Sequence, residues 1–197
     1  MFRLILLLLL VSSIWSCSLG GGPAPTDHFY RLPEVALDSQ VASYKSIVVK
    51  AVKSTGLYHE RAILFIESDK PLELQRYHYS FWSTTPAELV HNALYQGVVS
   101  SGIADQVNRD LTENRPDFVL DTRIIHFERI INGQTVNIEI ELEVSVKSGS
   151  LTGDTWTKRY KVNEALQNTD MHSTAEAFGA ALTAISNELI EDLLSKK

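Results

Sequence analysis

Hydrophobic and polar residues alternate most regularly between positions 118 and 147. In the second half of this stretch every second residue is apolar; these positions are Val136, Ile138, Ile140, Leu142, Val144 and Val146. The pair Asn132-Gly133 precedes them, and such a pair favours a tight turn because both residues accept a positive φ. The pattern predicts a β-hairpin with strands at 118–131 and 134–147, buried on one face and solvated on the other.

The first arm of this hairpin does not keep a single apolar face. A two-residue turn pairs Phe127 with Ile138, but the same register carried further places Asp121 and Arg123 on the apolar face. One extra residue exchanges the two faces of a strand. We therefore predict a β-bulge between Ile124 and Phe127.

Four shorter runs, rich in β-branched and aromatic residues, predict further strands at 46–53, 62–67, 75–82 and 155–162. In the run at 75–82, strict alternation places Tyr77, Tyr79 and Phe81 on one side and Trp82 on the other. Aromatic residues at this spacing form either core or the lining of an apolar groove, and both interpretations stay open. Unless a bulge intervenes, either Phe81 or Trp82 faces away from the core, and we expect Trp82 to be the exposed residue, as the anchor of an interface.

Two segments predict amphipathic helices. In the first, Thr85 is a helix N-cap, Pro86 suits the first turn, Glu88 completes a capping box and Gly102 ends the helix. The second is expected to begin at Ser173. Its apolar stripe consists of Phe178, Leu182, Ile185, Leu189 and Leu193.

These elements predict an α+β domain of two layers, with a mostly antiparallel β-sheet and two amphipathic helices packed on one face. In the last strand, Arg159 and Lys161 are expected to face the glutamates of the hairpin across a solvated sheet surface. We place a single domain at 29–197.

The first residues have the pattern of an export signal. Arg3 precedes an unbroken apolar run from Leu4 to Val11, and a short polar stretch leads to Cys17. The run is too short for a membrane span, which needs about 20 residues. We expect a lipoprotein signal peptide at 1–16 and a flexible Gly/Pro-rich tether at 17–28.

The segment Ile14-Trp15-Ser16-Cys17 resembles the lipobox of bacterial lipoproteins, with Trp15 replacing the usual small residue. The resemblance implies that Cys17 becomes the mature N-terminus and carries a diacylglycerol and an additional acyl chain such as palmitate. Several acyl chains on one residue give stable membrane anchoring. Ser18 follows Cys17, and by the same resemblance this favours the outer membrane, with the domain facing the periplasm.

Composition excludes several classes of function. The formal net charge is −6 without a basic run, which argues against nucleic acid as a partner. Cys17 is the single cysteine, the six histidines show no metal-ligand spacing, and no nucleophile or phosphate-binding motif occurs. We therefore expect no metal, no catalytic residues, no enzyme activity, and no cofactor beyond the covalent lipid on Cys17.

Three segments, in order, carry a family resemblance: Phe29-Tyr30-Arg31-Leu32-Pro33, then the run from Arg76 to Pro86 ahead of a helix, then Leu120, Ile124 and Phe127-Glu128 in a strand. The chain resembles the ABC-type transport auxiliary lipoprotein family, of the PqiC kind. This resemblance implies a non-catalytic accessory component of a lipid transport system. Its partners would be an MCE-domain protein, an ABC permease, the membrane and possible phospholipid cargo.

The same resemblance marks four residues as possible partner or lipid contacts: Tyr30, Leu32, Tyr79 and Trp82. Two alternatives stay open at this point. One is a structural or assembly lipoprotein, chaperone-like, for outer-membrane or lipopolysaccharide machinery. The other is a periplasmic enzyme whose active site leaves no sequence motif.

Overall fold

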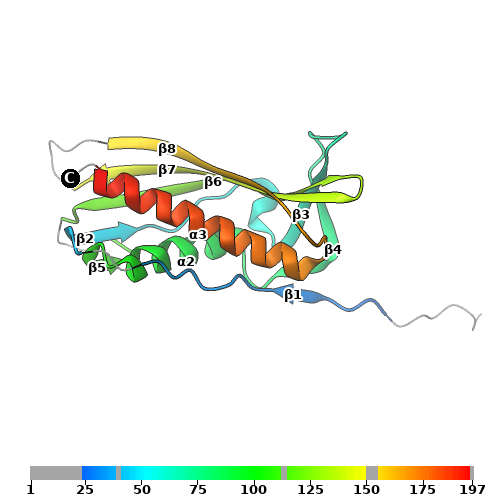
Figure 1. Ribbon diagram of the computed structural model, residues 1–197, viewed down its shortest axis with the longest axis horizontal. Helices are drawn as coiled ribbons and strands as arrows, with labels where there is room; N and C mark the ends of the chain where they lie inside the picture. Colours follow the sequence, from blue (N-terminus) through cyan, green and yellow to red (C-terminus); the bar gives the residue numbers. More distant parts are fainter. Residues whose placement is uncertain (1–23, 39–40, 112–114, 150–154, 196–197) are drawn as a thin grey trace, which may run out of the picture.

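The computed structural model describes residues 24–38, 41–111, 115–149 and 155–195; the predicted signal peptide and Cys17 lie outside these ranges. The described residues form an eight-stranded sheet and two long helices, which confirms the α+β class (Figure 1). The strands are β1 (His28–Tyr30), β2 (Tyr44–Val49), β3 (Ala62–Glu67), β4 (Gln75–Trp82), β5 (Ala104–Asn108), β6 (Phe118–Asn132), β7 (Thr135–Ser148) and β8 (Thr155–Ala165). The helices are α2 (Pro86–Ser101), α3 (Met171–Ser195) and a short 3-10 helix, η2 (Gly56–His59).

The long strand β6 organises the sheet. On one side it pairs antiparallel with β7, which in turn pairs with β8. On the other side its first residues pair in parallel with β2 and its last residues pair in parallel with β3. The sheet therefore forks beside β6, and η2 belongs to the connection between the two branches. Strands β2 and β3 correspond to the predicted runs at 46–53 and 62–67, but their parallel pairing with β6 was not predicted. The short strands β1 and β5, which also pair in parallel, were not predicted either, because parallel pairing joins distant segments without a local turn signal.

The predicted hairpin and its bulge are confirmed, but the turn differs from the prediction. Ile124 pairs with Leu142 and His126 pairs with Glu141, so Ile125 is the extra residue. Asn132 pairs with Thr135, which leaves Gly133, with a φ of 59°, and Gln134 as the turn. Asn132 therefore remains in the strand, and Phe127 pairs with Ile140 instead of the predicted Ile138. A shift of two residues keeps the same side chains on the buried face, because side chains alternate with a period of two.

Helices α2 and α3 pack against the apolar face of the sheet, and Figure 1 shows α3 running across it. The predicted start and end of α2 are confirmed: Thr85 Oγ1 accepts a hydrogen bond from the Glu88 N–H at 3.3 Å, and Gly102 has a φ of 63°. Helix α3 begins two residues before the expected Ser173. Asp170 caps it, because its carboxylate accepts the Ser173 N–H at 2.8 Å.

The expected exposure of Trp82 is wrong, because its side chain is 1% exposed in the core. The cause is an irregular register between β3 and β4. Ala62 pairs with Phe81 and Leu64 pairs with Arg76, so the four residues at 77–80 lie opposite one residue of β3. Three extra residues, an odd number, exchange the faces of the strand and turn Trp82 inward.

The segment that follows β1 is packed onto the two helices. Val35 is buried, and the Leu37 N–H donates to Ser100 Oγ at 3.1 Å. Pro33 lies so close to α3 that a Cβ added at Gly179 would be 2.5 Å from its Cδ. The connection between β1 and the rest of the domain is therefore fixed by direct packing. Within the described ranges, no helix has the length and apolar character that crossing a bilayer requires.

Candidate functional site

The four predicted contact residues gather at the edge of the sheet where β1 pairs in parallel with β4. Tyr30 and Trp82 are register partners, and Tyr30 and Leu32 pack partly buried against the core. Tyr79 is 48% exposed. We call His28–Tyr30 together with Tyr79–Trp82 the β1–β4 edge. The structure thus leaves Tyr79 available for contact and assigns Trp82 to the core.

The β1–β4 edge also exposes an aromatic residue that was not predicted. Phe29 is 54% exposed and stacks on Phe81 with ring centroids 5.6 Å apart. The guanidinium of Arg61, the residue just before β3, lies 5.4 Å from the centroid of the Phe29 ring. No local signal links Arg61 to Phe29, because they meet only through β4, which pairs with β1 and whose Trp82 N–H donates to the Arg61 carbonyl. Exposed aromatic and arginine side chains are characteristic of interaction surfaces.

A buried carboxylate lies where the sheet forks. Glu128 is 4% exposed; it accepts hydrogen bonds from the Tyr58 hydroxyl and, at 2.9 Å, from the Phe127 N–H. Burial, and then the hydrogen bond to Glu128, raise the pKa of Tyr58, so its hydroxyl remains a donor. His126 Nδ1 lies 2.9 Å from the second Glu128 oxygen. These bonds fix η2 against β6, which is a structural role.

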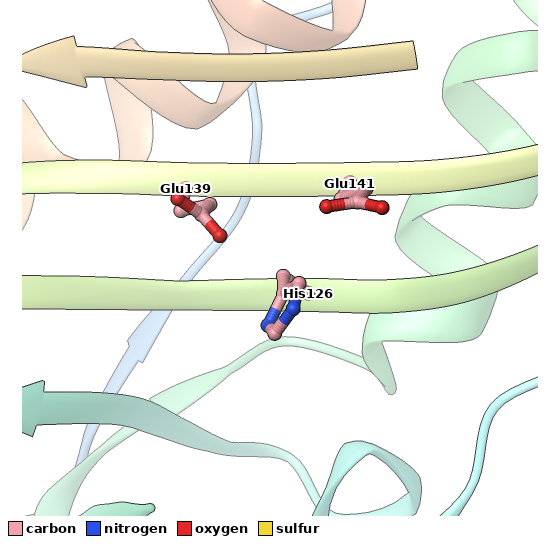
Figure 2. A group of neighbouring side chains, drawn as sticks. All are labelled: His126, Glu139 and Glu141. Atoms are coloured by element: carbon pink, nitrogen blue, oxygen red, sulfur yellow. The ribbon is translucent and has the colours of Figure 1, made fainter. Parts of the chain in front are cut away.

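Three potential metal ligands meet on the open face of the sheet, where Figure 2 shows Glu139 and Glu141 on β7 beside His126 on β6. Their ligand atoms lie within 4.8 Å of one another. Sequence spacing did not reveal this group, because its members come from two strands whose register depends on the bulge.

Both carboxylates of this group already have partners. Glu139 accepts hydrogen bonds from Lys161 at 3.1 Å and Asn163 at 3.0 Å, and Glu141 forms ion pairs with Lys161 and Arg159. Burial raises the pKa of Glu139, but the bonds from Asn163 and Lys161 outweigh burial and hold it below its usual range. The arrangement is the predicted ladder of opposite charges between β7 and β8, and a metal ion would have to displace lysine and arginine.

One serine–histidine pair resembles part of a catalytic triad. Ser54 Oγ lies 3.2 Å from His59 Nδ1, near η2. In the portion of the chain that the structure describes, no carboxylate contacts His59, so nothing orients the imidazole as a base. The contact closes the local loop around η2 and offers no activated nucleophile.

Comparison with known proteins gives one family match. The family described as "ABC-type transport auxiliary lipoprotein component" matches residues 30–189, which is most of the chain. None of the curated proteins compared with the chain matches it.

Two solved structures share the fold. A crystal structure of a Xanthomonas campestris protein is 22% identical, with a TM-score of 0.69, over 83% of this chain and 92% of that one. A crystal structure of an uncharacterized protein is 13% identical, with a TM-score of 0.67, over 85% of this chain and 99% of that one. At these identities the likeness establishes the fold alone.

The family match extends from the last residue of β1 into α3 and includes β2 to β8 and α2. It agrees with the sequence resemblance carried by Tyr30-Arg31-Leu32-Pro33 and by the segment from Arg76 to Pro86. Its members are envelope-associated auxiliary components of transport rather than a known class of enzyme. The chain therefore belongs to the family of ABC-type transport auxiliary lipoproteins.

Proposed function

We propose that the protein is an outer-membrane lipoprotein that faces the periplasm and serves a lipid transport system of the ABC/MCE type without catalysing a reaction. The family match over residues 30–189 is the observation that carries this proposal. Acyl chains on Cys17 would hold the domain to the membrane. An MCE-domain protein and an ABC permease would be its partners, and the covalent lipid would be its only non-protein group.

The position of the β1–β4 edge supports this role. A short stretch of chain separates Cys17 from β1, so a domain anchored at Cys17 would keep this edge near the membrane. Phe29 and Tyr79 are exposed there. Tyrosine and phenylalanine supply large contact areas at protein interfaces, and they favour this edge as the surface that meets a partner.

The test is capture of partners from native membranes. We expect the affinity-tagged protein, after mild crosslinking and detergent extraction, to retain an MCE-domain protein identified by mass spectrometry. Tyr79→Ala should reduce this capture about five- to thirtyfold, as expected for loss of an aromatic anchor worth about 1–2 kcal/mol. Val99→Ala, which removes a 43% exposed apolar side chain from the far end of α2, is the matched control and should retain wild-type capture.

Two results would contradict the proposal. Capture of a β-barrel assembly or lipopolysaccharide component in place of the MCE protein would favour the chaperone-like alternative. Equal capture by Tyr79→Ala and wild-type protein would remove the β1–β4 edge from the partner interface.

A further inference from the structure

A cavity of about 330 Å³ opens beside the β1–β4 edge. It lies where the register between β3 and β4 slips, and its lining includes Glu60, Arg61, Arg76, Tyr77, His78 and Phe81. Arg76 and Phe81 are five residues apart on β4, but their partners on β3, Leu64 and Ala62, are only two residues apart. Irregular pairing of this kind re-aims side chains and is frequent at binding sites.

The cavity carries more positive than negative charge. Arg76 Nη1 lies 2.7 Å from Glu60 Oε2, and both side chains are well exposed, at 56% and 43%. No carboxylate contacts the Arg61 guanidinium within the described ranges. Two arginines therefore face one glutamate, in a protein whose overall net charge is −6. Against that background, a local positive cavity favours an anionic ligand.

The donors match one class of anion. Guanidinium groups present paired N–H donors that fit phosphate oxygens, and an imidazole offers an N–H donor in either protonation state. Arg76 and His78 on β4, and Arg61 just before β3, thus supply donors around the same space. Phe81 supplies an apolar wall, which continues outward onto Phe29 through their stacked rings.

We infer that this cavity binds a phosphate ester group. Its volume is at the small end of ligand pockets, which suits a polar headgroup rather than a whole lipid with two acyl chains. The exposed ring of Phe29, which stacks on Phe81 of the cavity wall, favours a membrane phospholipid as the source, with its apolar part against this ring. This choice of source rests on the proposed function, whereas the phosphate site itself rests on the cavity.

Calorimetric titration of the purified, full-length lipidated protein in a maltoside detergent tests the inference. The probes are dihexanoyl phosphatidylethanolamine, glycerophosphoethanolamine and inorganic phosphate. We expect saturable binding of the first two, and Arg61→Gln combined with Arg76→Gln should raise both dissociation constants about tenfold or more. Arg159→Gln combined with Arg123→Gln is the matched control, because it removes the same two charges from side chains that are 60% and 50% exposed on the open sheet face.

Further variants separate the possible sources. If Phe29→Ser weakens only the dihexanoyl lipid, the ligand is a phospholipid. If inorganic phosphate binds as tightly as both esters, the site takes free phosphate. Arg61→Lys, which keeps the charge but loses the paired N–H donors, should bind more weakly than wild type and more tightly than Arg61→Gln. Thermal unfolding should show that each variant is folded. If the double variant does not fold, the single variant Arg61→Gln provides the same comparison.

Absence of saturable binding by every probe, or unchanged binding in the double variant, would overturn the inference. Both results are independent of partner capture. Failure to capture an MCE-domain protein, with phosphate binding intact, would reject the proposed function and leave the phosphate site in place.

Discussion

Trp82 lies at the centre of an aromatic cluster that joins three elements. Its ring packs edge-on against Phe127 of β6 at 5.7 Å and against Phe178 of α3 at 5.2 Å between centroids. Phe127 and Phe178 also contact each other, at 4.4 Å. Such pairs add to the free energy gained by burying apolar area. The residue that links β1 and β4 by register therefore also holds the sheet against the long helix.

Trp82→Ala should lower the free energy of unfolding by about 3–5 kcal/mol, because it leaves a large cavity among rigid aromatic neighbours. Urea denaturation followed by circular dichroism measures the change. Tyr79→Ala, on the same strand but exposed, should change the unfolding free energy by about 0.5 kcal/mol or less. A Trp82→Ala variant as stable as wild type would place this indole at the surface, against the structure.

At the scale of elements, the segment after β1 shows how close packing selects glycine. Pro33 rests on α3 at Gly179, where an added Cβ would lie 2.5 Å from the proline Cδ and 2.9 Å from its Cγ. Glycine within a helix ordinarily costs about 0.5–1 kcal/mol relative to alanine. At position 179 the clash of an added Cβ with the proline ring outweighs the better helix propensity of alanine. The ring cannot rotate away as a flexible side chain would.

Gly179→Ala should therefore destabilise the domain, by about 1–3 kcal/mol, although alanine is the better helix former. Combining it with Pro33→Ala should restore stability, because the double variant removes the clashing ring atoms. A double-mutant cycle of unfolding free energies gives the coupling between the two positions. Additive effects of the two substitutions would show that Pro33 does not pack on Gly179.

The sequence predicted the ends of an element correctly where those ends are set by residues close to one another in the chain. Thr85 and Gly102 bound α2 as expected, because the cap and the left-handed glycine act on their own neighbours. The start of α3 was misplaced, because Asp170 and Ser173 are both acceptable caps and tertiary packing selects between them. The bulge at Ile125 was predictable because, without an extra residue, the first arm of the hairpin would place Asp121 and Arg123 on the apolar face.

At the scale of the whole molecule, a net charge of −6 gives the protein no electrostatic attraction to an anionic membrane surface. In the proposed function, membrane attachment therefore depends on Cys17, which lies outside the described residues. If acyl chains on Cys17 are the only anchor, removing them should free the domain entirely.

Cys17→Ala should shift the protein from the outer-membrane fraction to released or unprocessed material, measured by fractionation and immunoblotting of cells that express it at native level. Ser18→Asp provides a matched comparison, because it keeps the lipid but carries the residue that resembles an inner-membrane sorting signal. We expect this variant to remain membrane-bound and to change membranes. Outer-membrane attachment of Cys17→Ala equal to wild type would contradict the lipid-anchor model.

The sequence by itself determined the hairpin with its bulge, the two helices, the burial of their apolar stripes and the family, because each depends on periodicity or on residues close together in the chain. Only the tertiary structure decided the parallel partners of β6, the inward position of Trp82, the grouping of His126 with Glu139 and Glu141, and the cavity beside Arg61 and Arg76. These features depend on register between segments far apart in sequence. The slip of three residues between β3 and β4 reverses which side chains of β4 face the core, and the alternation within residues 75–82 does not record it.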